Sequence, residues 1–593
     1  MSIKKGFGII EIIVALGLFA VVGVTGITMV LHSFTANRLG NEQTVASNLT
    51  SSGLEIVKNI KMQNWSNLVP GTYGLKNTAG VWSLSTLPET WDKYTRTITI
   101  ADSQRDGLGN VVDSGGTADP NTKKVTVTTG WNVGATRNNT VELSEYLTNY
   151  SKTISSSGDA LIAWGDTTTT PKWNTYTNTT DIFGTKSNLV AGESARNMIV
   201  KTSPTKSEAI AAYTSATGVL HVQCYNGTTW SEDFTVAVGG TGTTRRFDIG
   251  FEKTTGDAMI VYSTNTTTTN ELAYRTKAGS SGCGAANWSA ATNLNPVRTS
   301  GRVHWVRLES DPRSGQNILG LAWADEQSDL SAMFWDGTAW VNEPTAVSET
   351  SLEIIAVGQD IETFDITYES LSGNFMLVWG RIVGPNINGA RYRVCTGGTA
   401  TCTWGAVTTP PTFTDDVTNL DISSNPASNE IVFASIGDNQ SDLQVGYWNG
   451  SAWTNTANRD TSVTNPFAGS QKVATGWLKS GATTRSLVTY DDQGSGRINW
   501  YIGNAGSFTA QTDFLQTPAF SNNQGYYKIV MDPKNSDRLM FAVADNSNDL
   551  FAKRLVMNAT PTFTWTNSDG SAALELNLSQ NRAGPFSLDY WRN

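Results

Sequence analysis

The longest apolar stretch of the chain lies near its N-terminus, where residues 12–31 carry no charge. At 1.5 Å per residue, a helix of this length spans roughly 30 Å, which is the thickness of a bilayer core. Lys4 and Lys5 precede the stretch and Arg38 follows it. The stretch is too long for a secretory signal, and no small-residue cleavage site ends it. The pattern therefore predicts a transmembrane helix that stays in the mature protein.

Glu11 places a carboxylate at the entry to this apolar stretch. A charge within a bilayer costs up to about 2.5–3.5 kcal/mol, and less near the interface, so we expect Glu11 to have a partner. Together with Gly6 and Phe7 it forms the pattern Lys-Lys-Gly-Phe-x-x-x-Glu directly before the apolar helix. This pattern closely resembles the N-terminus of type IV prepilins.

The resemblance implies a processing and assembly pathway. A prepilin peptidase would cut between Gly6 and Phe7, and the new Phe7 amine would be methylated. Glu11 would then neutralise the Phe7 amine of a neighbouring pilin subunit during filament assembly. The implied location is the cytoplasmic membrane, as a single-pass protein, and then the cell exterior in a pilus. The alternative is an ordinary single-span anchor whose glutamate is accidental.

Polar and apolar residues alternate at helical spacing after the membrane stretch. Between residues 32 and 62 the apolar positions recur mainly at steps of three and four: Val45, Leu49, Leu54, Ile56, Val57 and Ile60. This spacing is typical of an amphipathic helix. We therefore expect one long helix over residues 7–62, following a leader of residues 1–6, with an apolar stripe on its second half that another element covers.

Residues 63–150 contain the segments that we expect to form this cover. Residues 81–84, 94–101, 123–129 and 141–147 alternate or are β-branched, and loops rich in Pro, Gly, Asn and Asp separate them. They predict a small antiparallel sheet packed on the helix. Residues 94–100, 123–127 and 141–149 resemble the sheet of PilV-type prepilins.

One loop of this predicted sheet has the spacing of a calcium-binding loop. Its oxygen-bearing residues fall at positions 1, 3, 5, 9 and 12, with glycine at position 6: Asp102, Gln104, Asp106, Asn110 and Asp113, with Gly107. An EF-hand loop binds calcium with this spacing, although its last ligand is glutamate. The alternative is a solvated hairpin loop, in which the same residue types are common.

After a Ser-rich linker, residues 151–158, the chain repeats a unit of about fifty to sixty residues up to residue 593. Each unit has a hydrophobic strand that ends near a turn, an Ala- and aromatic-rich strand, a third strand and a tryptophan. Complete units begin near Met198, Phe247, Trp305, Phe364, Leu420, Val473 and Tyr527. A unit of this length matches a four-stranded propeller blade, so residues 159–593 predict an all-β propeller.

The two ends of the repeat region are incomplete in complementary ways. Residues 160–164 and 172–176 look like the second and third strands of a unit without its first, and residues 585–591 look like a first strand alone. A ring that closes by giving its first blade a strand from the C-terminus needs this arrangement. Counting the shared blade, we expect eight blades, with seven or nine as alternatives.

Several units share an Asn-Gly or Asp-Gly turn between two aromatic residues. The turns occupy residues 225–230, 335–340 and 448–453. Glycine, asparagine and aspartate tolerate positive φ, and the aromatic residues face each other across the hairpin. Trp335, Trp340, Trp448 and Trp453 are candidates for stacking on a sugar ring. The alternative is that these tryptophans fill the space between blades.

Charge and cysteine content narrow the class of protein further. The net charge of −10 and the lack of a basic run argue against nucleic acid as a partner. Cys395 and Cys402 bracket a short Gly/Thr stretch, and in an oxidising exterior we expect them to form a disulfide. Cys224 and Cys283 are either a second disulfide or buried thiols.

Candidate catalytic residues are few. The three histidines are isolated in sequence and show no metal-ligand spacing, and no nucleophile elbow or phosphate-binding motif occurs. Asp325, Asp438 and Asp545 precede similar Gln-Ser-Asp-Leu or Asn-Asp-Leu motifs. They are either turn formers or a ring of carboxylates such as a glycosidase uses.

These observations lead to one functional expectation and one alternative. We expect a non-enzymatic pilus subunit, in minor copy or at the tip, whose propeller binds a surface glycan or protein and which needs no cofactor unless calcium binds the loop described above. The alternative is a membrane-anchored exported enzyme, such as a glycosidase.

Overall fold

The structure of the protein is a computed structural model. It describes residues 8–592 except residues 64, 79–80, 107–110, 113–114, 134–136, 149–158, 295–297, 299, 354–360, 385–386, 412, 438–439, 464–469, 493–496, 515–524 and 571. The chain divides into two compact units, Met1–Thr153 and Ile154–Asn593, and we describe each by itself.

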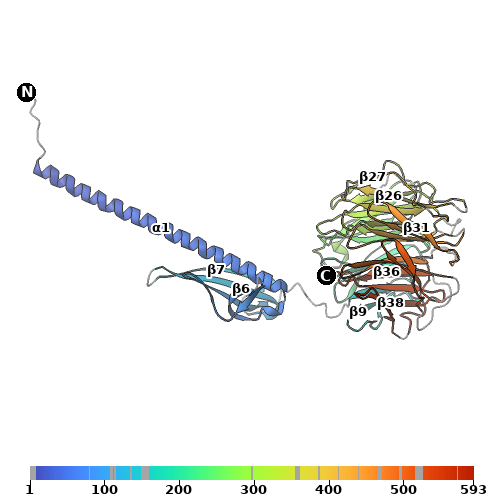
Figure 1. Ribbon diagram of the computed structural model, residues 1–593, viewed down its shortest axis with the longest axis horizontal. Helices are drawn as coiled ribbons and strands as arrows, with labels where there is room; N and C mark the ends of the chain where they lie inside the picture. The colour runs from blue at the N-terminus through green and yellow to red at the C-terminus, as the bar shows by residue number, and fades with distance from the viewer. Residues whose placement is uncertain are drawn as a thin grey trace, which may run out of the picture. The chain divides into compact units, whose positions relative to one another are not determined.

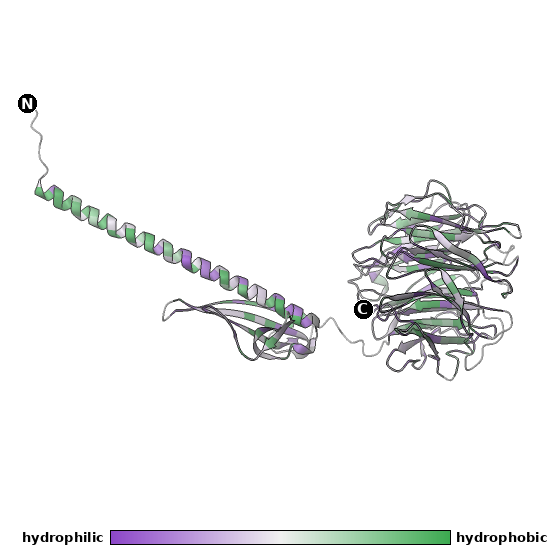
Figure 2. Ribbon diagram, in the orientation of Figure 1, coloured by the Kyte–Doolittle hydropathy of each residue, from purple (hydrophilic) through white to green (hydrophobic). Residues whose placement is uncertain are grey.

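The first unit begins with the long helix α1 (Ile9–Gln63). Figure 2 shows that hydrophobic residues cover the first half of α1 on all sides, as in a helix surrounded by lipid. Its threonines bond within the helix: the Thr25 and Thr28 hydroxyls donate to the Val21 and Val24 carbonyls at 2.9 and 3.0 Å. Among the described residues, α1 is the one helix long and apolar enough to cross a membrane.

An antiparallel sheet packs on the second half of α1. A short 3-10 helix (Trp65–Asn67) links the two. The strands are β1 (Gly71–Thr78), β2 (Val81–Ser85), β3 (Glu89–Trp91), β4 (Tyr94–Arg105), β5 (Val111–Val112), β6 (Thr117–Val133) and β7 (Arg137–Thr148). Their order is β2-β1-β4-β6-β7, with β3 and β5 paired to β4. The predicted helix with a small antiparallel sheet is confirmed.

The helix and the sheet meet through small and branched side chains. Leu54, Val57 and Ile60 are buried against Ile98 and Val127 of the sheet. At Gly53 a Cβ atom would lie 2.9 Å from Val127 Cγ1, so glycine permits the close approach. Val45, predicted on the covered stripe, is 39% exposed, and Ala46 is buried in its place. The covered face therefore passes through Ala46 rather than Val45, and it already includes Glu42, which is buried and accepts a bond from the Trp131 indole N–H at 3.1 Å.

A buried arginine ties the sheet to the helix backbone. Arg96 of β4 donates from one guanidinium nitrogen to the Leu49 carbonyl at 2.6 Å and to the Ser52 hydroxyl at 2.9 Å. Its Nε donates to the Glu89 carboxylate at 2.9 Å. These bonds satisfy a cation that is only 5% exposed.

The first residues of the candidate calcium loop, up to Arg105, belong to strand β4. Asp102 lies within β4, paired in register with Lys123, and its carboxylate forms an ion pair with the Lys123 ammonium. The Gln104 side chain accepts a bond from the Gly116 N–H at 2.9 Å. Asp106 follows the end of β4, whereas Asn110 and Asp113 lie outside the described residues. Asp102 and Gln104 are thus engaged within the sheet, whereas calcium binding by Asp106, Asn110 and Asp113 stays a prediction.

The second unit is an eight-bladed propeller, as predicted. Blade 1 contains β40 (Phe586–Tyr590), β8 (Ala160–Trp164), β9 (Lys172–Thr177), β10 (Ile182–Phe183) and β11 (Ser187–Asn188). Blade 2 contains β12 (Ala195–Thr202), β13 (Ala209–Ser215), β14 (Val219–Tyr225) and β15 (Trp230–Ala237). Blade 3 contains β16 (Phe247–Phe251), β17 (Ala258–Ser263), β18 (Leu272–Lys277) and β19 (Thr292–Leu294), with a 3-10 turn (Ala285–Asn287) before β19. Blade 4 contains β20 (Val303–Ser310), β21 (Leu319–Asp325), β22 (Leu330–Trp335) and β23 (Trp340–Val341).

The remaining blades repeat this order. Blade 5 contains β24 (Phe364–Tyr368), β25 (Phe375–Gly380), β26 (Ala390–Thr396) and β27 (Thr403–Trp404). Blade 6 contains β28 (Asn419–Ser424), β29 (Ile431–Ile436), β30 (Leu443–Trp448) and β31 (Trp453–Asp460). Blade 7 contains β32 (Val473–Ser480), β33 (Thr483–Tyr490), β34 (Asn499–Asn504) and β35 (Ser507–Ala510). Blade 8 contains β36 (Tyr526–Met531), β37 (Arg538–Ala544), β38 (Leu550–Met557) and β39 (Phe563–Thr566).

The ring closes through the C-terminal strand. β40 pairs antiparallel with β8, with Phe586 opposite Trp164 and Tyr590 opposite Ala160. Blade 1 therefore combines the first and last strands of the propeller sequence, as the incomplete ends of the repeat predict. Closure leaves the inner edge of β8 covered, which removes an open strand edge.

Two disulfides add covalent links. Cys395 of β26 and Cys402, the residue before β27, form a disulfide across the turn between these strands, with 5.4 Å between Cα atoms. Cys224 of β14 joins Cys283, which follows β18, with 5.5 Å between Cα atoms. The first link is the predicted one. The second connects blade 2 to blade 3 and settles a pairing that the spacing of the cysteines left open.

Candidate functional site: the central channel of the propeller

The inner strands of all eight blades surround one polar cavity. Residues of β12, β16, β20, β24, β28, β32, β36 and β40 line it, and its volume is about 210 Å³. Side chains of a strand alternate between two faces, so Phe364 and Ile366 pack between blades while Asp365 and Thr367 point into the cavity. At roughly 30 Å³ per water molecule, the cavity holds about seven waters or one small molecule.

Three aspartates of the channel link neighbouring blades by hydrogen bonds. The Asp248, Asp421 and Asp589 carboxylates each accept a hydrogen bond from a backbone N–H of the next blade. The donors are Leu308 at 2.9 Å, Thr475 at 2.8 Å and Thr202 at 2.8 Å. Because inner strands of different blades do not pair as a sheet, these bonds satisfy backbone groups at the blade boundaries. They are structural contacts.

A second group of charges forms a closed network. Arg245 and Arg307 both contact Glu362 Oε1 at 2.7 Å, and Arg307 lies 3.4 Å from Asp365. Burial raises the pKa of Glu362, and the two arginines partly offset this effect. Arg307 stays charged, because the Asp365 and Glu362 carboxylates outweigh its desolvation and raise its pKa well above the ordinary value.

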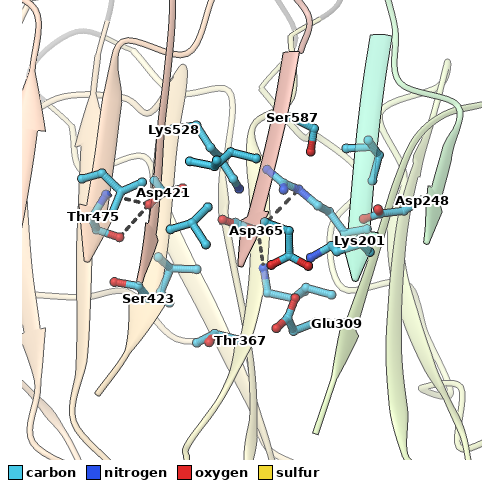
Figure 3. A pocket seen from close by; sticks show the side chains of 18 of the residues that line it. Lys201, Asp248, Glu309, Asp365, Thr367, Asp421, Ser423, Thr475, Lys528 and Ser587 are labelled. Atoms are coloured by element: carbon cyan, nitrogen blue, oxygen red, sulfur yellow. Dashed lines mark hydrogen bonds and ion pairs between the residues drawn. The ribbon is translucent and has the colours of Figure 1, made fainter. Parts of the chain in front are cut away.

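Two lysines in the channel remain without an ion-pair partner among the described residues. Lys528 belongs to β36 of blade 8 and Lys201 to β12 of blade 2, and Ser587 of blade 1 lies between them in the ring (Figure 3). Burial and the positive charge of Arg307 lower the pKa of Lys528, the Asp421 carboxylate acts in the opposite direction, and Lys201 lowers the pKa to a smaller extent. We call Lys528, Ser587 and Lys201 the cationic arc.

The opposite wall carries carboxylates. Asp365 of blade 5 and Asp421 of blade 6 line the same cavity, and the Thr475 hydroxyl donates to Asp421 at 2.6 Å (Figure 3). Burial raises the pKa of Asp421 to about 6, and the neighbouring Asp365 carboxylate contributes in the same direction. We call Asp365 and Asp421 the acidic arc. The two lysines and these two carboxylates thus come from different blades, and of the two carboxylates Asp365 also lies 3.4 Å from Arg307.

The candidate sugar-stacking tryptophans lie between blades. Trp335, Trp448 and Trp453 are only 6–7% exposed, and Trp340 is half-buried. The Trp335 indole N–H donates to Glu252 at 2.7 Å, and its ring lies 5.8 Å from that of Tyr274. Both partners belong to the preceding blade. The structure gives these residues the packing role that was the alternative to sugar stacking.

The same arrangement recurs two blades later. The Trp448 indole N–H donates to Glu369 at 2.6 Å, and its ring lies 5.9 Å from that of Tyr392. Trp453 lies 5.7 Å from Trp448 and completes the cluster. Each tryptophan pair therefore covers an aromatic residue of the blade before it.

The candidate catalytic aspartates form turns. The Asp325 carboxylate accepts bonds from the Gln327 and Asp329 N–H groups at 2.9 and 3.0 Å. Asp545 makes the equivalent bonds to Ser547 and Asp549 at 2.9 and 3.0 Å. Both carboxylates are nearly fully buried, and Asp438 lies outside the described residues. The two described residues are turn formers, which was one of the two interpretations of this repeat.

The processing motif is only partly described. Gly6 and Phe7 lie outside the described residues, and Glu11 lies in the first turn of α1. The Gly8 N–H donates to the Glu11 carboxylate at 3.1 Å. Glu11 thus satisfies one of the free N–H groups at the start of the helix.

Sequence reasoning missed the channel residues, although a signal for them exists. Several first strands of a unit place a polar residue between two apolar ones, as in Phe247-Asp248-Ile249, Phe364-Asp365-Ile366 and Leu420-Asp421-Ile422. A polar residue that recurs at the same position of several inner strands marks the lining of a propeller channel.

Comparisons with known proteins add little to this picture. No family model matches the chain, and no curated protein matches it. Among solved structures, the BP39L lectin from Burkholderia pseudomallei is similar at 10% identity, with a TM-score of 0.44, over 64% of this chain and 100% of that chain. The fucose-specific lectin from Aleuria aurantia matches at 11% identity and TM-score 0.30, over 54% of this chain and 91% of that chain. A putative 6-phosphogluconolactonase from Bacteroides fragilis matches at 9% identity and TM-score 0.37, over 73% and 98%. Similarities this weak support no statement about ligand or activity.

Proposed function

We propose that the protein is a membrane-anchored subunit of a type IV pilus or related filament, in minor copy or at a tip. In this proposal it displays the propeller outside the cell, where the central channel binds a small glycan-type ligand. The observation that carries the filament role is the Lys-Lys-Gly-Phe-x-x-x-Glu pattern before a helix that is apolar on all sides.

The structure of the first unit supports the filament role in a second way. The sheet covers only the second half of α1, so the large apolar residues of the first half, such as Phe19 and Met29, are 77% exposed. Such a surface is stable only in lipid or against other apolar helices. Insertion in the membrane followed by packing with other pilin helices meets this requirement in both places.

Mass spectrometry of the mature protein tests the filament role. We expect an N-terminus at Phe7 carrying a methyl group, produced by a prepilin peptidase, and detection of the protein in sheared surface filaments. An intact Met1, or a protein that stays in the membrane fraction when filaments are sheared off, contradicts the proposal.

The channel supports the ligand-binding role. Its lining is rich in hydroxyl and charged groups, which suit the hydroxyls of a sugar, and its volume suits a single ring. A binding screen of the full chain in detergent against monosaccharides tests this role. Absence of binding to any sugar contradicts it.

One observation favours the alternative of an exported enzyme. A carboxyl group with a pKa near 6 beside a second carboxylate, as at Asp421 and Asp365, is an arrangement that glycosidases use for acid catalysis. Turnover of a glycoside that Asp421→Asn abolishes would favour the enzyme, whereas binding without turnover favours the adhesive subunit.

A further inference from the structure

We propose that the ligand of the channel is an acidic monosaccharide, whose carboxylate binds the cationic arc of Lys528, Ser587 and Lys201. This inference rests on the proposed channel function and specifies its ligand class. Three features of the channel support this ligand class: its two lysines, the chemistry of the opposite wall and its volume.

The ammonium groups of Lys201 and Lys528 have no ion-pair partner among the described residues. Most charges of the channel are engaged: Asp248 and Asp589 bond the next blade, and Arg245 and Arg307 share Glu362. Lys201 and Lys528 differ, because neither has an ion pair or a side-chain hydrogen bond with the described residues. Burial and the Arg307 charge disfavour the Lys528 ammonium, the Asp421 carboxylate offsets part of this effect, and the Lys201 ammonium adds a smaller repulsion. An anion that binds between the two lysines adds the attraction that burial and Arg307 make necessary.

The wall of the channel opposite the lysines offers carboxylates and hydroxyl groups. The acidic arc and the hydroxyls of Thr367, Ser423 and Thr475 face the same cavity. Carboxylates accept hydrogen bonds from hydroxyl donors and repel a second anionic group. A simple inorganic anion would leave this wall unused. A sugar acid carries a carboxylate on one side of its ring and hydroxyl donors on the other, which matches the two arcs.

The volume of the cavity limits the size of the ligand. A cavity of about 210 Å³ lies below the range of roughly 300–1,000 Å³ typical of sites for drug-sized ligands. It accommodates one pyranose ring and not an oligosaccharide. A chain-terminal acidic sugar, or the free monosaccharide, is therefore the form that enters the channel.

Titration calorimetry of the full chain in detergent tests this assignment. The probes are glucuronate and galacturonate, each compared with its neutral counterpart, glucose or galactose. We expect the acids to bind and the neutral sugars to bind at least tenfold more weakly, because a charge-assisted hydrogen bond is lost. We also expect Lys528→Met and Lys201→Met each to weaken binding of the acids about tenfold or more, and Lys528→Arg to retain most of it.

Lys534→Met is the matched control. Lys534 is an exposed lysine of the turn between β36 and β37, outside the channel lining, and we expect unchanged affinity. Unchanged melting of each variant shows that the propeller remains folded.

The outcomes separate this inference from the function on which it rests. Equal affinity for acidic and neutral sugars, or acid binding that survives both Lys→Met changes, overturns the inference and leaves channel binding intact. Preference for a zwitterionic amino acid over the sugar acids also overturns it. If no sugar of either kind binds, the proposed channel function is wrong and the inference falls with it.

Discussion

Phe586 pairs with Trp164 across the seam of the propeller, although the two residues come from opposite ends of the propeller sequence. Both side chains are almost fully buried, and both belong to the same apolar cluster between blades 8 and 1. This pair is therefore the point at which the chain converts a row of blades into a closed ring. The channel depends on it, because Ser587 follows Phe586 and completes the cationic arc.

Deletion of residues 585–593 should destabilise the propeller strongly. The deletion removes Phe586, Leu588 and Tyr590, each at most 3% exposed, and burial of each such side chain contributes about 1.5–3 kcal/mol. It also opens the edge of β8. We expect a large fall in the melting temperature of the propeller transition, measured by calorimetry on the full chain. Arg592→Ala, at an exposed position just after β40, is the control and should change melting little. An unchanged melt of the deletion would show that β40 does not hold the ring.

Substitutions at Asp336 and Gly337 should separate the side-chain and backbone contributions of this turn to the stability of the propeller. The Asp336 carboxylate accepts bonds from the Thr338 and Ala339 N–H groups at 2.8 Å each, and only Gly337 has a positive φ, of 98°. Gly337→Ala should cost about 1–2 kcal/mol, and from backbone strain alone, since a Cβ would lie 3.5 Å from Asn317 Cβ in ordinary contact. Asp336→Ala should cost about 1 kcal/mol through the lost hydrogen bonds.

Asp336→Asn is the informative control for this turn. The equivalent residues Asn226 and Asn449 make the same bonds at 2.9–3.0 Å, so the substitution should be nearly neutral at pH 7. The Thr338 hydroxyl, followed by the backbone bonds, lowers the pKa of Asp336. Its stabilisation is therefore present above the unfolded pKa and is lost as the pH falls through the folded pKa. Urea unfolding between pH 7 and pH 3 should show this loss in the parent and not in Asp336→Asn; identical pH profiles would contradict the assigned role.

The sequence predicted the elements better than the site, and the reason is physical. The apolar run, the repeat and its incomplete ends specify the helix, the blades and the closing strand, because each depends on local periodicity. The role of an aspartate in the channel depends on its neighbours in the next blade. Asp248 and Asp421 occupy similar Phe/Leu-Asp-Ile contexts, yet Asp248 lies 4.0 Å from the Arg245 guanidinium, whereas Asp421 lies beside Asp365, which helps to raise the pKa of Asp421. The arc formed by Lys528 and Lys201 exists only after the ring has closed.

The role of the tryptophans also depends on residues of a neighbouring blade. Trp335 and Trp448 have the composition of a sugar-stacking platform, but Tyr274 and Tyr392 of the preceding blades cover them. No local pattern around either tryptophan reveals that cover. The sequence signal for this packing lies in Glu252 and Glu369. Each follows an inner strand and accepts a hydrogen bond from the tryptophan indole of the next blade.

Glu11→Gln should block filament assembly without removing the protein from the membrane. Glutamine still accepts the Gly8 N–H, which lies 3.1 Å from the Glu11 carboxylate, so the start of α1 is preserved. The substitution removes only the negative charge that we propose to pair with the Phe7 amine of a neighbouring subunit. We expect normal amounts in the membrane fraction and a sharp loss from sheared filaments, with Glu11→Val behaving alike. Normal incorporation of Glu11→Gln would contradict the charge-pairing role, and loss of the variant from the membrane would point to a role in folding instead.

Asp421→Asn should stabilise the propeller at neutral pH and remove a pH dependence. Burial and the Asp365 carboxylate raise the pKa of Asp421 to about 6, above its usual value near 4, so the folded state binds a proton more tightly than the unfolded state. By linkage, this group favours folding most below pH 4, and its contribution falls as the pH rises from about 4 to about 6. Above pH 6 the carboxylate is charged in both states and the full cost remains. Asparagine keeps an acceptor for the Thr475 N–H, at 2.8 Å in the parent, and carries no charge at any pH.

The expected gain from Asp421→Asn is on the order of 1 kcal/mol at pH 7, since channel water screens part of the cost, and it should vanish near pH 4. Unfolding by urea across pH 4 to 8 measures it. Asp248→Asn is the matched control, because Asp248 makes the same bond to the next blade, at 2.9 Å from the Leu308 N–H, and its charge lies 4.0 Å from the Arg245 guanidinium. Removing that paired charge should not stabilise the protein. A gain of equal size in both variants would mean that burial of the carboxylate, rather than the neighbouring Asp365, accounts for the raised pKa of Asp421.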